Sequence, residues 1–341
     1  MIVAVLLIGY AALLGVLGPR VLKIGTWADR SPRLAIVCWQ ALSVSVLASV
    51  TLSGLALAAP AAPFSTNLAA TLRACLMAIQ NGYATPSGVG ATLAGLVLAG
   101  AVVARSISCL VAGLVRSARE RIRHLQALSL ITSTSEHAET VILDHPTPAA
   151  YCLPGRHRRV VLTSAALDAL DSYQLQAVLA HERAHLAGRH HLVLEAAAVL
   201  NRAFPRVPLF AQAHDEVTRL VELVADDVAA RRYGRLPVAT AMVTMSRGDA
   251  PSMALAAGGA GALERVRRLL EPARPLRSKT VLAGLALAIA VLVIPAIAAI
   301  TPALSAARMP ACPMVATASS SATTSTCHSS GAHDVARLTA A

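Results

Sequence analysis

Four long apolar stretches are the strongest constraint that this sequence places on its own fold. They cover residues 2–18, 34–59, 88–115 and 279–303, and each is close to the ~20 apolar residues that a helix needs to cross a bilayer. The composition agrees, because 55% of the 341 residues are hydrophobic and only 14% are charged. We therefore predict a mainly α-helical membrane protein with four transmembrane helices.

The first apolar stretch has a second interpretation, as a secretory signal peptide. Such a peptide begins with a basic region and ends at small residues that permit cleavage. The chain has neither feature, since apolar residues follow Met1 directly. We interpret residues 2–18 as a membrane span, so that residues 1–115 hold three spans and their loops.

Basic residues flank the apolar stretches unevenly. They gather after the first stretch, after the third and before the fourth: Arg20, Lys23, Arg30, Arg33, Arg116, Arg119, Arg121, Arg123, Arg274, Arg277 and Lys279. The loop between the second and third stretches holds only Arg73. Because positive charge marks the cytoplasmic side, residues 116–278 are expected to form a cytoplasmic domain of a multi-pass cell-membrane protein. The N-terminus and residues 304–341 then lie outside.

The formal net charge of +12 has the same origin. Arg residues beside a span place their charge among anionic headgroups and fix the topology. A nucleic-acid partner is the alternative, but the basic run at 116–123 adjoins a span and lacks interleaved aromatic residues. We expect the lipid bilayer as a partner and no direct binding of nucleic acid.

Cysteine usage argues against a cysteine-based metal site, because no two cysteines have the CxxC spacing. Cys312 and Cys327 both fall in the outer tail, where an oxidising compartment would allow a disulfide between them. The tail, residues 304–341, is rich in Ser, Thr and Ala. We expect it to be disordered and too short for a folded sensor domain.

The cytoplasmic segment begins with short apolar runs bounded by turn residues. These runs predict strands at about 141–144, 149–153 and 159–162. Helical periodicity follows them, so we expect an α+β domain with a short edge sheet.

Helices occupy the rest of this segment. Asp171, three residues before Gln174, is typical of a capping box that starts a helix. We expect this helix to run without a break to about residue 200, and further helices at about 210–232 and 262–270.

The first of these helices carries His181, Glu182 and His185 in the spacing HExxH. Residues four apart share a helix face, so both imidazoles can bind one zinc ion. The Glu after the first His then faces the open position of the metal, where it can deprotonate a bound water. The alternative is an amphipathic helix whose His pair and solvated Glu bind nothing. The spacing favours a catalytic zinc site with Glu182 as the general base.

A catalytic zinc ion keeps three protein ligands, and two residues compete for the third position. His191 completes the spacing HExxHxxGxxH with Gly188, a pattern that works by breaking the helix at the Gly. No turn signal follows Gly188, and in an unbroken helix His191 faces away from His185. Glu222 is the other candidate, on a separate predicted helix that can return antiparallel to the first.

Asp226 lies four residues after Glu222 and shares its helix face, where it could orient a ligating His through a hydrogen bond. Glu216 is a spare carboxylate. Without the HExxH motif, the simpler interpretation is that these acids are solvent-exposed side chains on a helix that also carries Arg219 and Arg231. The nearby HExxH spacing favours one zinc ion with Glu222 as its third ligand.

Residues 180–185 and 222–226 resemble the HExxH…ExxxD arrangement of gluzincin membrane peptidases. More narrowly, the chain resembles the BlaR/MecR-type membrane zinc metallopeptidases, with the HtpX-like peptidases as the next most similar group. The resemblance extends to residues 150–162 and 263–270 and to the flanking spans.

This resemblance implies a zincin-like domain and a role for each motif residue. His181, His185 and Glu222 would bind zinc, Glu182 would act as general base and acid, and Asp226 would support a ligand from behind. The predicted strand near residue 150 would hold a substrate in extended form along its edge.

The chain departs from these relatives in two ways. They often place an Asp five residues after the second His, where this chain has His190. The antibiotic-sensing members also carry a large extracellular penicillin-binding domain after the last span, which this chain lacks. We therefore expect no direct sensing of β-lactams.

The resemblance implies a bacterial zinc metalloendopeptidase that cleaves a protein substrate. A cytoplasmic transcriptional repressor is the candidate substrate, in a pathway of regulatory proteolysis. An HtpX-like quality-control protease is one alternative, and a non-enzymatic membrane signal transducer is another. The intact HExxH motif favours an enzyme. The sequence leaves the oligomeric state, the substrate and the stimulus open.

Overall fold

The structure is a computed structural model, and it describes residues 2–58, 73, 77, 86–131, 140–154, 159–246, 252–272 and 274–307. Across these residues the chain is mostly helical, with a single small sheet. The predicted mainly helical fold with four apolar helices is thereby confirmed. Cys312, Cys327 and the tail beyond Ala307 fall outside the described residues.

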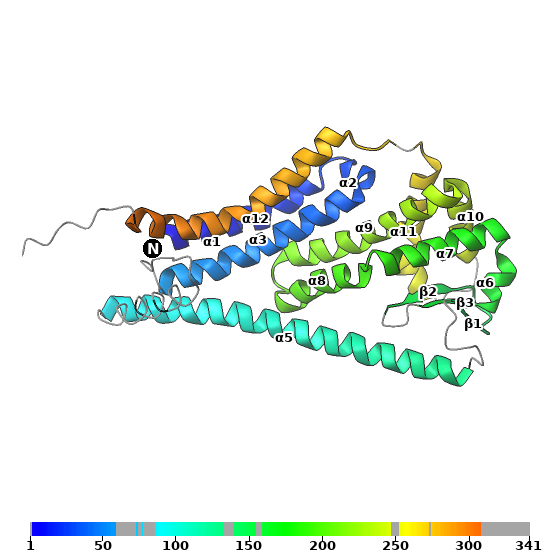
Figure 1. Cartoon of the computed structure of the whole chain (residues 1–341), viewed down its shortest axis with the longest axis horizontal. Helices are drawn as coiled ribbons and strands as arrows, with labels where there is room; N and C mark the ends of the chain where they lie inside the picture. Colours follow the sequence, from blue (N-terminus) through cyan, green and yellow to red (C-terminus); the bar gives the residue numbers. More distant parts are fainter. Residues whose placement is uncertain are drawn as a thin grey trace, which may run out of the picture.

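Four of the helices are long and apolar enough to cross a membrane. They are α1 (Ile2–Leu22), α3 (Pro32–Ala58), α5 (Pro86–Ile131) and α12 (Ser278–Ala307). The short helix α2 (Trp27–Arg30) joins α1 to α3. Helix α3 packs against the other three, and α5 diverges from the bundle toward the rest of the chain (Figure 1).

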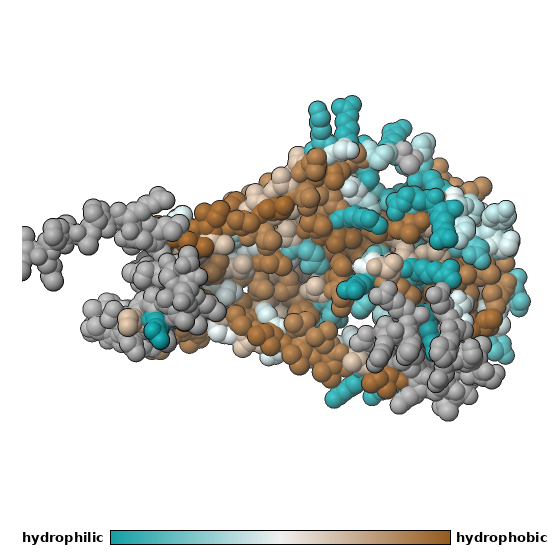
Figure 2. All heavy atoms as spheres, in the orientation of Figure 1, coloured by the Kyte–Doolittle hydropathy of each residue, from teal (hydrophilic) through white to brown (hydrophobic). Residues whose placement is uncertain are grey.

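The outer faces of these helices suit a lipid environment. Large apolar side chains such as Ile2, Val97 and Leu282 are more than 60% exposed. The resulting hydrophobic band covers one end of the molecule, whereas charged side chains gather at the other (Figure 2). A surface of this kind is stable in contact with acyl chains, which indicates a multi-pass membrane protein.

The sheet has three short strands in the order β1-β3-β2. Strand β1 (Thr140–Leu143) pairs parallel to β3 (Arg159–Thr163), and β2 (Ala150–Leu153) pairs antiparallel to β3. These bounds agree with the predicted strands to within a residue. Because β2 lies at the end of this order, one side of its backbone has no strand partner in the sheet.

Six helices follow the sheet and form the body of the domain. They are α6 (Ser164–Ala169), α7 (Ser172–Ala187), α8 (His190–Ala203), α9 (Pro208–Tyr233), α10 (Arg235–Ser246) and α11 (Ser252–Leu270). The predicted capping box is present: Asp171 accepts from the Gln174 amide at 2.8 Å, and the Gln174 side chain accepts in return from the Asp171 amide. This cap fixes where α7 begins.

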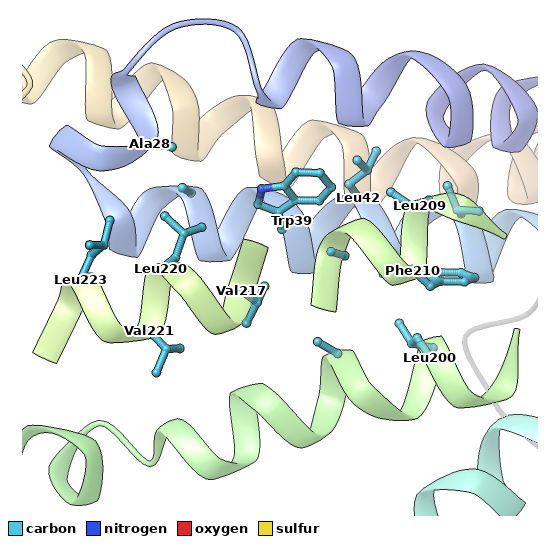
Figure 3. Close-up of a cluster of buried hydrophobic side chains, with 14 of the residues drawn as sticks. Ala28, Trp39, Leu42, Leu200, Leu209, Phe210, Val217, Leu220, Val221 and Leu223 are labelled. Carbon is cyan, nitrogen blue, oxygen red and sulfur yellow. The ribbon is translucent and has the colours of Figure 1, made fainter. Parts of the chain in front are cut away.

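The largest hydrophobic core lies between the apolar helix α3 and the domain. Trp39 and Leu42 of α3 pack against buried side chains of α9, and α8 adds Leu200 from the other side (Figure 3). The α9 members include Leu209, Phe210, Val217 and Leu220. Because α3 and the domain share one core, α9 is held rigidly at the end of the bundle of apolar helices.

Helix α5 joins the domain through a second, polar contact with α8. Arg105 donates from Nε to the carbonyl oxygen of Ala203 at 2.6 Å. About two turns further along α5, Gly113 lies against the ion pair between Glu195 and Arg202. A Cβ atom at Gly113 would overlap a carboxylate oxygen of Glu195. A glycine at this position therefore allows α5 to approach α8.

One sequence-based expectation about the helices is wrong. The helix that starts at Asp171 was expected to continue through Gly188, but α7 ends at Ala187 and α8 begins anew at His190. Arg189 between them has φ +48°, in the left-handed region that a helix cannot include. The break turns α8 toward α5 and α9, and it sets His190 beside the end of α7.

Candidate metal centre

The centre is built where α7 crosses α9. His181 and His185, one turn apart on α7, bring their Nε2 atoms to 3.1 Å from each other. Glu222 on α9 places one carboxylate oxygen 3.5 Å from the His181 Nε2 atom and the other 3.6 Å from the His185 Nε2 atom. One ligand atom from each of the three side chains lies within 4.8 Å of the others.

These separations fit one tetrahedral zinc ion. With zinc bonds of about 2.0–2.2 Å, two ligands of a tetrahedral site lie roughly 3.3 Å apart. The observed distances of 3.1, 3.5 and 3.6 Å bracket that value. Two imidazoles and a carboxylate are also a ligand set that catalytic zinc uses. The residues therefore fit the metal that the sequence predicts.

Asp226, one turn after Glu222, holds His181 from behind. Its Oδ1 atom lies 3.0 Å from His181 Nδ1, so the ring can donate there while Nε2 remains free for a metal. The Asp226 side chain is fully buried, and such a carboxylate needs compensation. Arg265 of α11 supplies it with two hydrogen bonds of 2.7 and 2.8 Å. Arg265 also contacts Glu222 at 3.0 Å.

This network controls the charge of the groups in it. Burial alone would raise the pKa of the Asp226 carboxyl, but hydrogen bonds from Arg265 and His181 outweigh burial and lower it to about 2. The pKa of Glu222 is lowered in the same way, by His181 and Arg265 against burial. Both carboxylates are consequently ionised at neutral pH. A ligand set with this negative charge favours a divalent cation.

His185 has a different supporting residue, the buried side chain of His190. The Nδ1 atoms of the two rings lie 3.1 Å apart, and the rings meet edge to face. Burial lowers the pKa of His185 to about 4 and also lowers that of His190. A neutral His185 that offers Nε2 to a metal carries its proton on Nδ1 and can donate it to His190.

Gly188 makes room for this arrangement. A Cβ atom there would lie 2.4 Å from Nε2 of His190, closer than any real contact of that kind. We expect Gly188→Ala to lower the free energy of unfolding by about 1–3 kcal/mol, the usual cost of overpacking, because the His190 ring must move. Gly261→Ala is the control, since nothing lies within 4 Å of the corresponding Cβ. Thermal or chemical unfolding measures both, and equal stability of the two variants would contradict this packing.

Glu182, the remaining motif residue, faces the sheet. Burial raises its pKa, and hydrogen bonds with Cys152 of β2 offset part of that rise. The half-buried Cys152 thiol lies beside Glu182, and desolvation together with the Glu182 charge raises its pKa to about 12, so it stays protonated. Glu182 is therefore placed between the His pair and the unpaired edge of the sheet.

The structure brings together the residues that the sequence singled out, and adds three more. His181, Glu182, His185, Glu222 and Asp226 all meet at the crossing of α7 and α9. His191 does not belong to the metal-binding group among the described residues.

Sequence reasoning missed His190, Arg265 and Cys152. His190 is only 7% exposed and packs on His185. Its position, where relatives often have an Asp, was the available signal. Arg265 fell within the predicted helix 262–270, and no pattern in the sequence linked it to Asp226.

Comparison with known proteins finds a similarity for the segment that carries the His pair. No curated protein and no solved structure matches the chain. Residues 116–206 match the model of peptidase family M48. The match includes His181, Glu182 and His185 and ends before α9, so Glu222 and Asp226 rest on geometry alone. The matched segment, which carries the HExxH spacing, is therefore similar to the peptidases of family M48.

Proposed function

We propose that this protein is a membrane-anchored zinc metalloendopeptidase that hydrolyses peptide bonds in a protein substrate. The observation that carries the proposal is the convergence of two imidazole Nε2 atoms and a carboxylate beside the half-buried Glu182. Family M48 supports the peptidase class. Four apolar helices support attachment to a membrane, with residues 116–278 on the cytoplasmic side of a bacterial cell membrane.

His181, His185 and Glu222 are the residues that would hold one zinc ion. The metal, when bound, would lower the pKa of a water molecule and polarise the scissile carbonyl group. Asp226 and His190 orient the two rings, each by a hydrogen bond at Nδ1. This leaves both Nε2 atoms turned toward Glu222.

Glu182 moves the proton. Its carboxylate takes a proton from the attacking water and then gives it to the amine that leaves as the peptide bond breaks. A pKa raised by burial suits this double role, because a stronger base accepts the proton more readily and its acid form can still donate it.

Strand β2 is the element that would hold the substrate. Its free edge offers backbone donors and acceptors to an extended peptide, which would lie as a further strand of the sheet. Cys152 of this strand contacts Glu182, so a peptide on the edge would pass the catalytic base. An extended segment of a protein is therefore the class of substrate that this geometry suits.

We further propose that the cleavage is regulatory and that the substrate is a cytoplasmic transcriptional repressor. The resemblance of residues 180–185 and 222–226 to BlaR/MecR-type peptidases supports this assignment over a quality-control role. A purely structural signal transducer would not need a half-buried Glu182 with a raised pKa beside the His pair.

Removal of the metal tests the proposed chemistry. We expect the purified full-length chain to contain about one zinc ion and to cleave an unfolded protein such as casein. A chelator such as 1,10-phenanthroline should abolish cleavage, and added Zn²⁺ should restore it. Cleavage that persists in zinc-free protein, verified by elemental analysis, would overturn the proposal.

A further inference from the structure

A cavity of about 1060 Å³, lined by many charged residues, lies between α2, α9, α11 and the segment that leads into α12. Among its 18 lining residues, Arg outnumbers the acids by eight to four. The cavity borders the metal centre at Arg265 and is otherwise made of residues that the proposed chemistry does not use.

Directed bonds fix the walls of this cavity. Arg219 of α9 binds the Asp29 carboxylate of α2 at 2.6 Å. Arg268 of α11 binds Asp227 of α9 at 2.8 Å and also donates to the carbonyl oxygen of Asp29. These bonds join three elements that are far apart in the sequence, so the cavity has a defined shape.

The remaining lining arginines have no carboxylate partner in the described part of the chain. Arg30 donates to the carbonyl oxygen of Arg274, and Arg235 donates to the carbonyl oxygens of Leu269 and Arg268. Arg231, Arg267 and Arg274 are solvent-exposed cations in the same cavity.

The acids that remain there, Glu264 and Glu271, are both exposed. They are too few to neutralise these arginines. The cavity therefore keeps a net positive charge and several guanidinium groups free to bind an anion.

The position of the cavity indicates where the anion comes from. Arg30 is the last residue of α2 and lies just before Pro32, where the span α3 begins. Arg274 lies four residues before Ser278, where the span α12 begins. Both are consequently at the ends of apolar helices, the depth at which phospholipid headgroups lie.

We propose that this cavity binds the phosphate group of an anionic phospholipid. Guanidinium groups match phosphate oxygens with paired hydrogen bonds, and this cavity presents them from α2, α9 and α11 at once. The acyl chains would lie along the exposed apolar surface of the neighbouring spans. This binding does not depend on zinc or on proteolysis.

Lipid titration of the full-length chain in detergent, followed by native mass spectrometry, tests the proposal. The probes are dioleoyl phosphatidylglycerol and dioleoyl phosphatidylcholine. The test variant is Arg231→Gln with Arg267→Gln, because neither side chain holds a wall of the cavity. The matched control is Arg119→Gln with Arg232→Gln, which removes the same charge at exposed positions outside it.

We expect the wild type to bind phosphatidylglycerol more tightly than phosphatidylcholine. The cavity variant should bind phosphatidylglycerol roughly 10- to 30-fold more weakly than the wild type. Each of the two lost basic residues is expected to weaken binding about fivefold, and the two effects multiply. The control should lose at most about fivefold, because Arg119 lies at the end of the span α5 and adds only diffuse attraction to headgroups. Equal losses in both variants would mean diffuse charge attraction and would overturn the site.

Two further arms separate the source of the phosphate and the dependence on catalysis. Bound phosphatidylglycerol should survive 10 mM inorganic phosphate; displacement by phosphate alone would overturn the lipid assignment in favour of a soluble phosphate ligand. Glu182→Gln should bind the lipid like the wild type. The lipid-binding result for this variant therefore tests the cavity independently of the proposed peptidase activity.

Discussion

Glu182→Gln is expected to abolish proteolysis while leaving zinc in place. The amide keeps the size of the side chain but cannot take a proton from water, and loss of a general base costs roughly 10²- to 10⁴-fold in rate. Glu182 is not among the three residues whose ligand atoms converge and could hold a metal, so the zinc content should remain near that of the wild type. Cleavage rates on casein and elemental analysis of the same preparation measure both quantities.

The matched control for this variant is Asp168→Asn, which neutralises an exposed carboxylate in the same domain. It should cleave at the wild-type rate.

Proteomic comparison of cells that carry wild type or Glu182→Gln extends the test to the substrate, which should accumulate intact in the variant. Accumulation of a transcriptional repressor would support regulatory proteolysis, whereas accumulation of diverse membrane proteins would favour quality control. Full activity of Glu182→Gln would remove it from the mechanism.

Glu222→Gln is expected to lose zinc. It removes the charge from the one carboxylate that lies within 3.6 Å of both ring Nε2 atoms. Loss of a residue that merely supports a ligand typically weakens metal binding 10- to 100-fold, and loss of a ligand should weaken it at least as much. Zinc content after dialysis against a chelator, together with a competition titration, measures the change.

Two variants serve as controls for Glu222. Glu216→Gln changes a carboxylate on the same helix that pairs with Arg219 instead of the His pair, so zinc should be retained. His191→Gln should also retain zinc, because His191 lies outside the metal-binding group. If His191→Gln lost zinc and Glu222→Gln kept it, the third ligand would be the histidine of the HExxHxxGxxH spacing.

The parts of this protein that follow local rules could be read from the chain. Four apolar stretches predict four long helices because crossing a bilayer requires about 20 apolar residues in succession. The capping box at Asp171 and Gln174 sets the start of α7 by contacts within four residues. His181, Glu182 and His185 share a helix face because of the helical repeat itself, with no help from the rest of the fold.

The break after α7 was not predictable in the same way. Gly188 alone costs a helix only about 1 kcal/mol, and the apolar pattern continues beyond it, so the sequence favours one long helix. The structure instead bends at Arg189, with φ +48°, because α8 packs on α5 and α9 and the His190 ring packs on His185. Contacts with distant elements outweigh a local preference of this size.

The sequence by itself determined the apolar helices, the small sheet and the chemical types of the candidate ligands. Tertiary structure decided how those ligands are supported. Asp226 and Arg265 are 39 residues apart, and only the packing of α11 against α9 gives the buried carboxylate its cation. The same packing of α2, α9 and α11 gathers arginines from distant segments into one cavity. Side-chain spacing along a helix is fixed by covalent geometry, whereas the meeting of separate helices depends on how the whole chain buries its apolar surface.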